Sequence, residues 1–193
     1  LRDLVDRLLG PTRELNKQKL NIHEVLEHVR NLIDAESENQ VTIMRDYDPS
    51  LPEFEFDRAQ LIQVVLNIMR NAMQAAESLR SCKIMLRSRA QRQFTIGATL
   101  HRLVCRIDII DNGPGIPEDK QAIVFEQFTQ LDTPAANASK GLGLGLNITQ
   151  SLTTLLGHEL SLKSKATQGC KFTIMAERAE SQAIPAPSPA LIN

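Results

Sequence analysis

The stretch Ile107-Asp-Ile-Ile-Asp-Asn-Gly-Pro-Gly115 decides how this chain can fold, because it carries an apolar strand directly into a carboxylate and a glycine-rich loop. Alternating apolar residues over Arg102 to Ile110 predict a strand with one buried face, which places Asp111 at the rim of a largely apolar surface. Gly113 and Gly115 permit positive φ and let the backbone approach a ligand closely. On its own, the same sequence is also a good plain turn.

A second motif, Asn67-Ile-Met-Arg-Asn-Ala72, lies on a helix that the sequence predicts from about Arg58 to Leu79, with Asp57 as its N-cap candidate. The core stripe of this helix is predicted to consist of Leu61, Val65, Ile68, Ala72 and Ala75. Asn67 and Asn71 are four residues apart, so their amides share one helical face. Amide oxygens suit Mg²⁺, which prefers oxygen ligands and takes few of them from protein. Arg70 points slightly aside and can pair with a phosphate or with an acidic surface. For this motif alone, a polar helix flank without a ligand is the plain alternative.

The third motif leads into a helix predicted over Gly143 to Leu156 and consists of Lys140, Gly141, Leu142, Gly143, Leu144 and Gly145. Glycines before a helix N-terminus expose backbone N–H groups to an anion, and the helix dipole favours negative charge there. Lys140 adds a cation for terminal phosphates. The Gly-x-x-x-x-Gly-Lys-Ser/Thr pattern of a Walker A loop is absent. A glycine-rich hinge without a ligand is the alternative interpretation.

The order and spacing of the three motifs predict a pocket for ATP and Mg²⁺. In this pocket Asp111 accepts a hydrogen bond from the adenine amino group, while Asn71 and Asn67 hold the metal. The predicted catalytic residues are Asn67, Arg70 and Lys140. The small residues at 132–139 are expected to form a mobile nucleotide lid, with an ordinary surface loop as the alternative.

The other periodic segments place these motifs in an α/β fold. Helices are predicted over Ile22 to Ala35, Arg58 to Leu79 and Gly143 to Leu156, and strands over Val41 to Met44, Lys83 to Ala90, Arg102 to Ile110, Glu159 to Ser164 and Cys170 to Ala176. The strands cluster, and each helix carries one apolar face. We therefore expect a two-layer sandwich in which a mixed sheet is covered on one face by three helices. His23 and His28 lie off the apolar helix face and are predicted to be solvated.

Composition restricts the class of protein. The 193 residues are 42% hydrophobic, enough for one sizeable core. The chain has 22 Lys and Arg against 23 Asp and Glu, and no stretch combines basic residues with interleaved aromatic residues. Nucleic acid is therefore not an expected partner. Three cysteines without metal-ligand spacing are expected to be reduced thiols of a cytoplasmic protein. No apolar run approaches 18 residues, so direct membrane contact is not expected.

The two ends of the chain differ from its middle. Residues 1–11 carry apolar residues at helical spacing until Gly10-Pro11, which is typical of the end of a longer amphipathic helix. Residues 12–178 are expected to form the domain itself. Residues 179–193 are rich in Pro, Ala and Ser, which predicts a disordered tail.

Taken together, the motifs resemble the catalytic ATP-binding domain of bacterial sensor histidine kinases, in the superfamily that includes gyrase, Hsp90 and MutL. The resemblance covers about Ile22 to Met175. Asn67–Ala72 resembles the N box of that family, Asp111–Gly115 the first glycine box, Phe125–Phe128 the F box, Gly141–Leu146 the second glycine box and Gly169–Thr173 the last box. The front portion, including residues 1–11 and 45–52, is similar more narrowly to the nitrogen-regulation sensor kinases of the NtrB group. The lid segment 125–132 is similar to that of hybrid sensor kinases.

This resemblance implies a Bergerat-type ATP-binding fold that transfers the γ-phosphoryl group of ATP to a histidine. It also implies a homodimeric full-length parent, in which residues 1–11 end the dimerisation helix. A response regulator would be the downstream acceptor, and for an NtrB-like protein a PII signal protein would be the regulator. Within the site, the family pattern implies that Ile116, Phe125 and Thr173 belong to the ATP-binding residues, with Thr173 supporting the adenine-binding Asp111.

The sequence departs from the family pattern at three places. Leu142 stands where Thr or Ser is usual, and Cys170 stands where Ser or Thr is frequent, which is expected to weaken contacts of the lid and phosphates. His23-Glu24 does not continue into the phosphoacceptor box, so the acceptor histidine is expected on another segment. An ATP-binding scaffold without phosphotransfer is therefore the alternative. A gyrase- or Hsp90-like hydrolase is disfavoured because no glutamate closely precedes Asn67 as a water-activating base.

Overall fold

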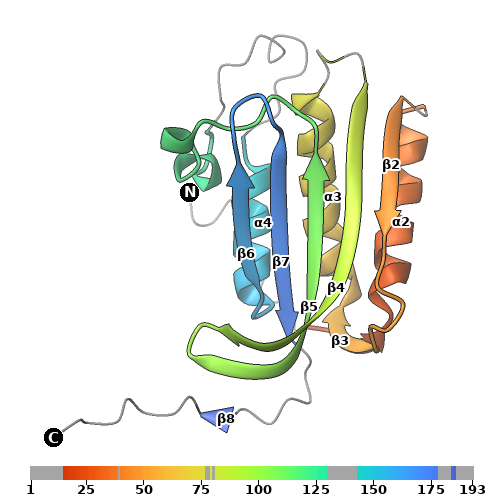
Figure 1. The fold of residues 1–193 in the computed structure, drawn as a ribbon, viewed down its shortest axis with the longest axis vertical. Helices are drawn as coiled ribbons and strands as arrows, with labels where there is room; N and C mark the ends of the chain where they lie inside the picture. The colour runs from red at the N-terminus through yellow and green to blue at the C-terminus, as the bar shows by residue number, and fades with distance from the viewer. Residues whose placement is uncertain are drawn as a thin grey trace, which may run out of the picture.

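The computed structural model describes residues 15–38, 40–76, 79, 81–129, 143–177 and 184–185. They form a two-layer α/β sandwich (Figure 1) with one main sheet in the strand order β2 (Val41–Asp46), β4 (Cys82–Ile96), β5 (Thr99–Asp111), β7 (Cys170–Glu177) and β6 (Glu159–Ser164). Strand β2 runs parallel to β4 and the remaining neighbours are antiparallel. Helices α2 (Ile22–Glu36), α3 (Arg58–Ala75) and α4 (Gly145–Leu155) cover one face. The predicted mixed sheet and its helical layer are confirmed.

Local sequence signals set where the long helices begin. The Asn21 side chain caps α2 by accepting from the His23 amide at 2.9 Å. The Asp57 side chain caps α3 by accepting from the Gln60 amide at 3.1 Å, as the sequence predicts. Such caps satisfy N–H groups that have no partner within the helix. Asp57 therefore sets where α3 begins, and with it the position of Asn67 and Asn71 along the helix.

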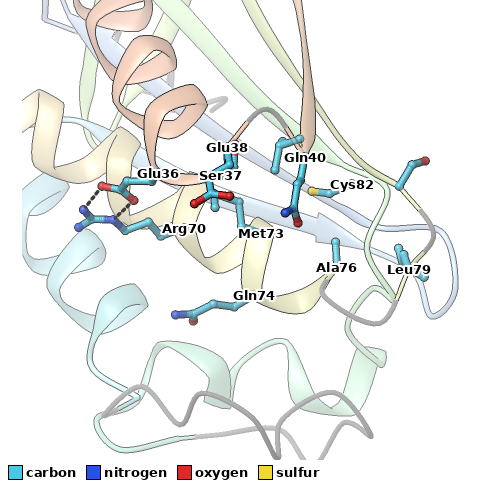
Figure 2. A pocket seen from close by; sticks show the side chains of 12 residues that line it. Glu36, Ser37, Glu38, Gln40, Arg70, Met73, Gln74, Ala76, Leu79 and Cys82 are labelled. Carbon is cyan, nitrogen blue, oxygen red and sulfur yellow. Dashed lines mark hydrogen bonds and ion pairs between the residues drawn. The ribbon is translucent and has the colours of Figure 1, made fainter.

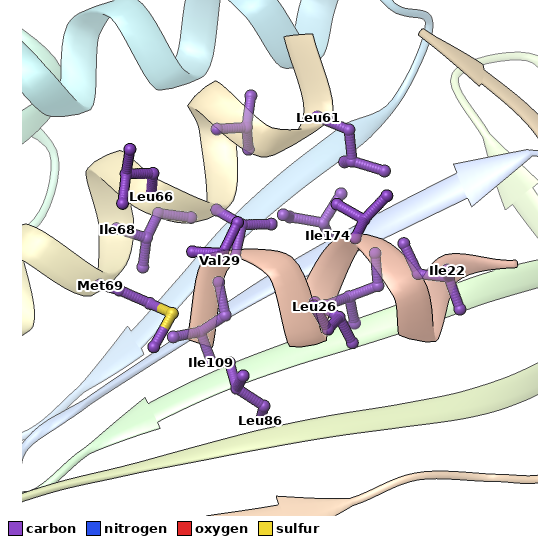
Figure 3. Packing of buried hydrophobic residues seen from close by; sticks show 14 of the residues in the cluster. Ile22, Leu26, Val29, Leu61, Leu66, Ile68, Met69, Leu86, Ile109 and Ile174 are labelled. Atoms are coloured by element: carbon purple, nitrogen blue, oxygen red, sulfur yellow. The ribbon is translucent and has the colours of Figure 1, made fainter. Parts of the chain in front are cut away.

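The core lies between the helical layer and the sheet (Figure 3). Helix α3 contributes the predicted stripe of Leu61, Val65, Ile68 and Ala72, together with Val64, Leu66 and Met69. Facing them, the sheet contributes Ile84, Leu86, Ile107, Ile109 and Ile174, each at most 1% exposed. Burial of one such side chain stabilises the fold by roughly 1.5–3 kcal/mol. This packing holds α3 rigidly against the strand that ends at Asp111.

A second, two-stranded sheet is present. Its first strand lies within residues 12–21, which the sequence indicated to be a polar connector between two helices. Strand β1 (Lys17–Leu20) pairs antiparallel with β3 (Phe54–Asp57), and Leu20, Phe54 and Phe56 are buried. The pairing was not predictable because β1 has no apolar alternation and its partner is more than 30 residues away. Two short 3₁₀ helices, η1 (Glu118–Lys120) and η2 (Ile123–Phe125), follow the β5 loop.

Several boundaries and one histidine differ from the predictions. Helix α3 ends at Ala75 rather than near Leu79, and both β4 and β5 extend well beyond their predicted lengths. His28 is exposed as predicted, but His23 is half-buried. It stacks on Tyr47 with ring centroids 4.7 Å apart and shares a 2.9 Å hydrogen bond with the Ser88 hydroxyl. The prediction for His23 is therefore wrong, because the loop after β2 folds over the start of α2.

Other predictions fall on residues outside the described ranges. They concern residues 1–11, the whole lid segment 132–139 and the larger part of the tail. Within the tail the structure describes Ile184–Pro185, which form β8 and pair antiparallel with β5 at Leu100 and Thr99, where the sequence predicted disorder. Among the described residues, no helix has the length and apolar character needed to cross a membrane.

The buried imidazole of His158 makes the stability of the domain depend on pH. It follows α4, lies 9% exposed and packs edge-on against Phe56, and burial lowers its pKa to about 4. In the unfolded chain the ring takes up a proton near pH 6.5. Its contribution to stability is therefore complete above pH 6.5 and is lost as the pH falls towards 4.

We expect the free energy of unfolding to fall by about 3 kcal/mol more in the parent chain than in His158→Phe when the pH drops from 7.5 to 4. Urea denaturation at the two pH values measures both proteins. Taking the difference between them removes the titration of other groups, such as Asp111, which both proteins share. Equal pH dependence in the two proteins would show that His158 takes up its proton in the folded state.

Candidate functional site

The carboxylate of Asp111 lies where β5 ends, at the rim of the core. The amides of Gly113 and Cys170 both donate to its Oδ1 atom, at 2.8 and 3.2 Å. Asp111 is 8% exposed, and burial raises the pKa of its carboxyl while the two N–H donors oppose the rise. Because both donors use Oδ1, Oδ2 keeps its lone pairs for a ligand as far as the described residues show.

The loop after Asp111 is seated on the turn between β6 and β7. Gly115 has φ +70°, and a Cβ there would lie 2.1 Å from the Lys165 carbonyl oxygen. Gly169 has φ +80°, and a Cβ there would lie 2.0 Å from the Asp111 carbonyl oxygen. The Ile116 amide donates to the Ser164 hydroxyl at 2.8 Å. Both glycines are therefore required for the approach of two backbones. The positive φ expected at Gly115 is confirmed, whereas the same expectation for Gly113 is wrong, because its φ lies outside the left-handed region.

Two asparagines of α3 carry buried side-chain amide groups. The Nδ2 atoms of Asn67 and Asn71 are buried and have no hydrogen-bond partner among the described residues. Gln63 donates to Asn67 Oδ1 at 3.0 Å, which orients that amide. Buried amides without partners are rare in folded proteins, so this pair indicates a place where a polar ligand binds.

The start of α4 closes the site against α3. A Cβ on Gly145 would lie 3.3 Å from Asn71 Oδ1, so the helix backbone packs directly on that amide. The N-cap Leu144 provides no side-chain cap, which leaves N–H groups available to an anion. Gly143, with φ +68°, accepts from the Phe128 amide at 3.1 Å. The second and third predicted motifs therefore meet in space, and a Cβ on Gly113 of the first motif would lie 3.6 Å from the Cβ of Ala75, one turn beyond Asn71.

The short helix η2 links the predicted lid region to α4. The Asn147 side chain donates to the Phe125 carbonyl at 2.9 Å, and Phe125 packs against the core. Phe128 is 52% exposed. Of the remaining predicted residues, Ile116 is buried in the seated loop, whereas Lys140, Gly141 and Leu142 lie outside the described residues.

Arg70 is paired with an acidic residue of α2. Its Nε donates to Glu36 at 3.0 Å and its Nη2 also contacts that carboxylate, which lowers the pKa of Glu36 (Figure 2). The pair borders a cavity of about 880 Å³ between the ends of α2 and α3. Asp111, Asn67 and Asn71 do not line this cavity, so it flanks the site rather than forming it.

The predicted role of Thr173 is wrong. Its hydroxyl donates to Asp108 Oδ1 at 2.7 Å and not to Asp111. Thr173 is the register partner of Asp108, whereas Asp111 is three residues further along β5 and therefore faces the other side of the sheet. Asp108 is 1% exposed and also pairs with Arg106 and Lys171, so Thr173 belongs to a structural network.

Three contributors to the site escaped the sequence analysis. They are the Cys170 amide that bonds Asp111, the Ser164 hydroxyl that holds the loop, and Gln63 that orients Asn67. Ser164 had no recognisable signal, because its partner lies 48 residues away. Gln63 lies one turn before Asn67 on the polar stripe of α3, so helical spacing was a usable signal for it.

Comparison with known proteins agrees with this geometry. The family model described as histidine kinase-, DNA gyrase B-, and HSP90-like ATPase matches residues 56–180. The chain is similar to the sensory histidine kinase/phosphatase NtrB of Vibrio alginolyticus (43% identity) and of Proteus hauseri (45%), each over 152 residues. These alignments cover 79% of this chain and 42% of each relative, so the chain spans less than half of their length.

Solved structures give the same result. The crystal structure of full-length ShkA in complex with AMPPNP aligns with a TM-score of 0.71 at 26% identity, over 94% of this chain and 35% of that one. The nucleotide-free catalytic domain of the histidine kinase ThkA aligns with a TM-score of 0.67 at 21% identity, over 84% and 96% of the two chains, which shows a shared fold. On the family match, and with the three motifs assembled at one site, the chain belongs to the histidine kinase-, DNA gyrase B- and HSP90-like ATPase family.

Proposed function

We propose that this domain binds ATP with Mg²⁺ and is the catalytic part of an NtrB-like sensor histidine kinase. The proposal rests on three kinds of polar group. They are the Asp111 carboxylate, of which only Oδ1 is hydrogen-bonded, the buried amides of Asn67 and Asn71, which have no partner among the described residues, and the start of α4, which has no side-chain cap. These groups suit, in turn, the amino group of a base, a metal ion with its phosphates, and an anion. No other part of the described structure brings these three kinds of group together.

The base is recognised by Asp111. Its Oδ2 accepts from an exocyclic amino group while Oδ1 stays bonded to the Gly113 and Cys170 amides. Adenine offers such an amino group where guanine offers a carbonyl oxygen, so the carboxylate selects adenine. The loop after Asp111 packs closely on the β6–β7 turn, and Gly113 has no side chain, so the adenine ring can lie against the backbone there.

The phosphates are held between α3 and α4. Asn71 and Asn67 would provide neutral oxygen ligands for Mg²⁺, which when bound neutralises charge on the phosphates. The free N–H groups at the start of α4 face the same space, because Gly145 packs on Asn71. These groups position the terminal phosphate rather than react with it, which is how most phosphoryl transfer is catalysed.

The phosphoryl acceptor lies outside this domain under the proposal. We expect a histidine on the dimerisation helix of a homodimeric parent to receive the γ-phosphoryl group, and a response regulator to receive it next. The 43–45% identity to NtrB proteins supports this assignment, and a PII signal protein as regulator rests on the same similarity. Arg70 is proposed to approach the phosphate or acceptor after releasing Glu36.

Phosphotransfer is tested by supplying the dimerisation helix of an NtrB relative in trans with γ-labelled ATP. An acid-labile, base-stable label on that helix supports the kinase assignment. Nucleotide binding without label supports the ATP-binding scaffold instead. Steady phosphate release without label indicates a hydrolase.

The metal ligands are tested by Asn71→Ala. We expect calorimetry to show that Mg²⁺ strengthens binding of an ATP analogue to the parent chain at least about tenfold, and that the variant loses most of this increment. Binding without metal should change little, because adenine is held by Asp111. Gln74→Ala, an exposed change one turn further along α3, is the matched control. A full magnesium effect in Asn71→Ala would contradict the assignment.

A further inference from the structure

Strands β4 and β5 continue past the main sheet as a two-stranded ribbon. Strand β2 pairs with β4 only from Cys82 to Arg87, and β7 pairs with β5 only from Val104 to Ile110. Residues 92–96 and 99–103, which pair with each other and with neither β2 nor β7, therefore form an extension that curves away below the sheet (Figure 1). Its tip lies at the opposite end of β5 from Asp111, so a partner bound there leaves the nucleotide site open.

The ribbon is basic although the chain as a whole is nearly neutral. Residues 81–107 contain six lysines and arginines and no acidic residue, whereas the net charge of the chain is −1. Arg92 and Arg102 are exposed and make no ion pair within the described part of the chain. They are next to one another diagonally across the ladder, because Arg92 pairs in register with Leu103. Both faces of the extension therefore carry an unneutralised cation.

The chain itself shows how this edge recognises acidic residues. Asp46 accepts from Arg89 at 2.7 Å and from Arg87 at 2.8 Å. Two residues later, Asp48 accepts from the backbone amide of Ala90 at 3.1 Å. An acidic segment with carboxylates at alternate positions thus runs along the outer edge of β4, bonding both arginines and the backbone, until Pro49 turns the chain away.

The edge beyond Ala90 has no partner strand among the described residues. Gln93, with φ +50°, interrupts its extended backbone, and the register with β5 resumes at Phe94. Because the Ala90 amide points outward, strand alternation turns the Arg92 amide outward as well. From Ser88 to Ile96, β4 pairs on its outer side with no described strand. Phe94 and Ile96 are half-buried and offer apolar surface beside the free edge. On the other edge of the ribbon β5 already takes an extended segment, β8.

We propose that the outer edge of β4 between Arg92 and Ile96 binds an acidic, extended segment of a partner protein by strand addition. The partner's backbone pairs with the free edge. One carboxylate lies beside Arg92, and a neighbouring one on the opposite face of the added strand lies towards Arg102, much as Asp46 meets Arg87 and Arg89. Apolar side chains two and four residues from the first carboxylate share the face of Arg92 and contact Phe94 and Ile96. This surface is independent of the nucleotide site.

The probe is the peptide Val-Thr-Val-Glu-Asp-Val-Thr-Val, which places one acid on each face of the added strand in either direction, titrated into the ¹⁵N-labelled chain at low salt. We expect amide resonances of residues 90–97 to shift and a matched peptide with lysine in place of each acid to leave them unmoved. Arg92→Glu combined with Arg102→Glu should weaken binding at least about tenfold, because two exposed ion pairs become repulsive. Both positions are exposed, and binding of an ATP analogue should stay unchanged.

A second peptide separates strand addition from plain charge attraction. It has the same side chains but N-methyl groups on alternate amides, so it keeps its charge and cannot pair with a strand. We expect it to bind at least about tenfold more weakly. Equal affinity of the methylated peptide, shifts confined to other residues, or no binding would overturn the proposal. Tighter binding of a single-stranded oligonucleotide of equal charge to residues 90–97 would also overturn it, in favour of nucleic acid.

Discussion

Gly169→Ala is expected to destabilise the domain by more than about 3 kcal/mol and to abolish nucleotide binding. An added Cβ would lie 2.0 Å from the Asp111 carbonyl oxygen and 2.9 Å from its carbon. Both are backbone atoms in the central strand, so no side-chain rotation relieves the overlap. The β6–β7 turn has to move away, and it carries with it the Cys170 amide that bonds Asp111. Urea denaturation and calorimetry with an ATP analogue measure the two effects.

Gly97→Ala is the matched control for this change. Gly97 also has positive φ, at +59°, but a Cβ there meets no atom within 4 Å. Its cost is the backbone strain alone, about 1 kcal/mol, with no effect on nucleotide affinity. The comparison isolates the close approach of two backbones from the conformational preference of glycine. Similar losses of stability in the two variants would refute the steric account of Gly169.

Asp111→Asn is expected to weaken binding of an ATP analogue at least about 100-fold. The amide keeps the shape of the carboxylate but replaces an acceptor by a donor, either towards the adenine amino group or towards the Gly113 and Cys170 amides. A donor facing a donor leaves a buried polar group unsatisfied, which is more costly than losing an average hydrogen bond. Calorimetry on the folded variant measures the loss.

Asp108→Asn is the control, because it makes the same chemical change three residues earlier on the same strand. Asp108 bonds Thr173 on the other face of the sheet, so stability should fall while nucleotide affinity stays within about twofold. The parent chain gives a second test through pH. Burial raises the pKa of Asp111, so affinity should decline as acidification protonates this carboxylate, and Asp111→Asn should lack that decline. Parallel pH profiles would contradict the role of Asp111.

The architecture was largely predictable because its signals are local. Apolar periodicity located the helices over α2, α3 and α4, and Asp57 marked the start of α3. Alternation located β5, β6 and β7, whose register follows from which face is buried. Strands β1 and β3 were missed, since a pair of short strands far apart in sequence has no local pattern that reveals it.

The site was predictable to the level of motifs but not of contacts. Asn71, Asp111 and Gly145 were expected at one pocket, and the packing of Gly145 on Asn71 brings two of their elements together. The partner of Thr173 was assigned incorrectly, because family position says nothing about which of two aspartates lies opposite in the ladder. The basic stretch 81–107 was visible in the sequence, yet its ribbon geometry was not.

By itself the sequence determined the class of fold, the order of its elements and the chemical groups available for a nucleotide. These follow from spacing along the chain, where hydrophobic period and residue type act over a few positions. Tertiary structure alone decided that Cys170 and Gly113 hold Asp111, that Glu36 holds Arg70, and that the edge of β4 stays open past Ala90. Each of these depends on strand register and on contacts between distant segments, and such contacts are set by the packing of the whole core rather than by any local stretch.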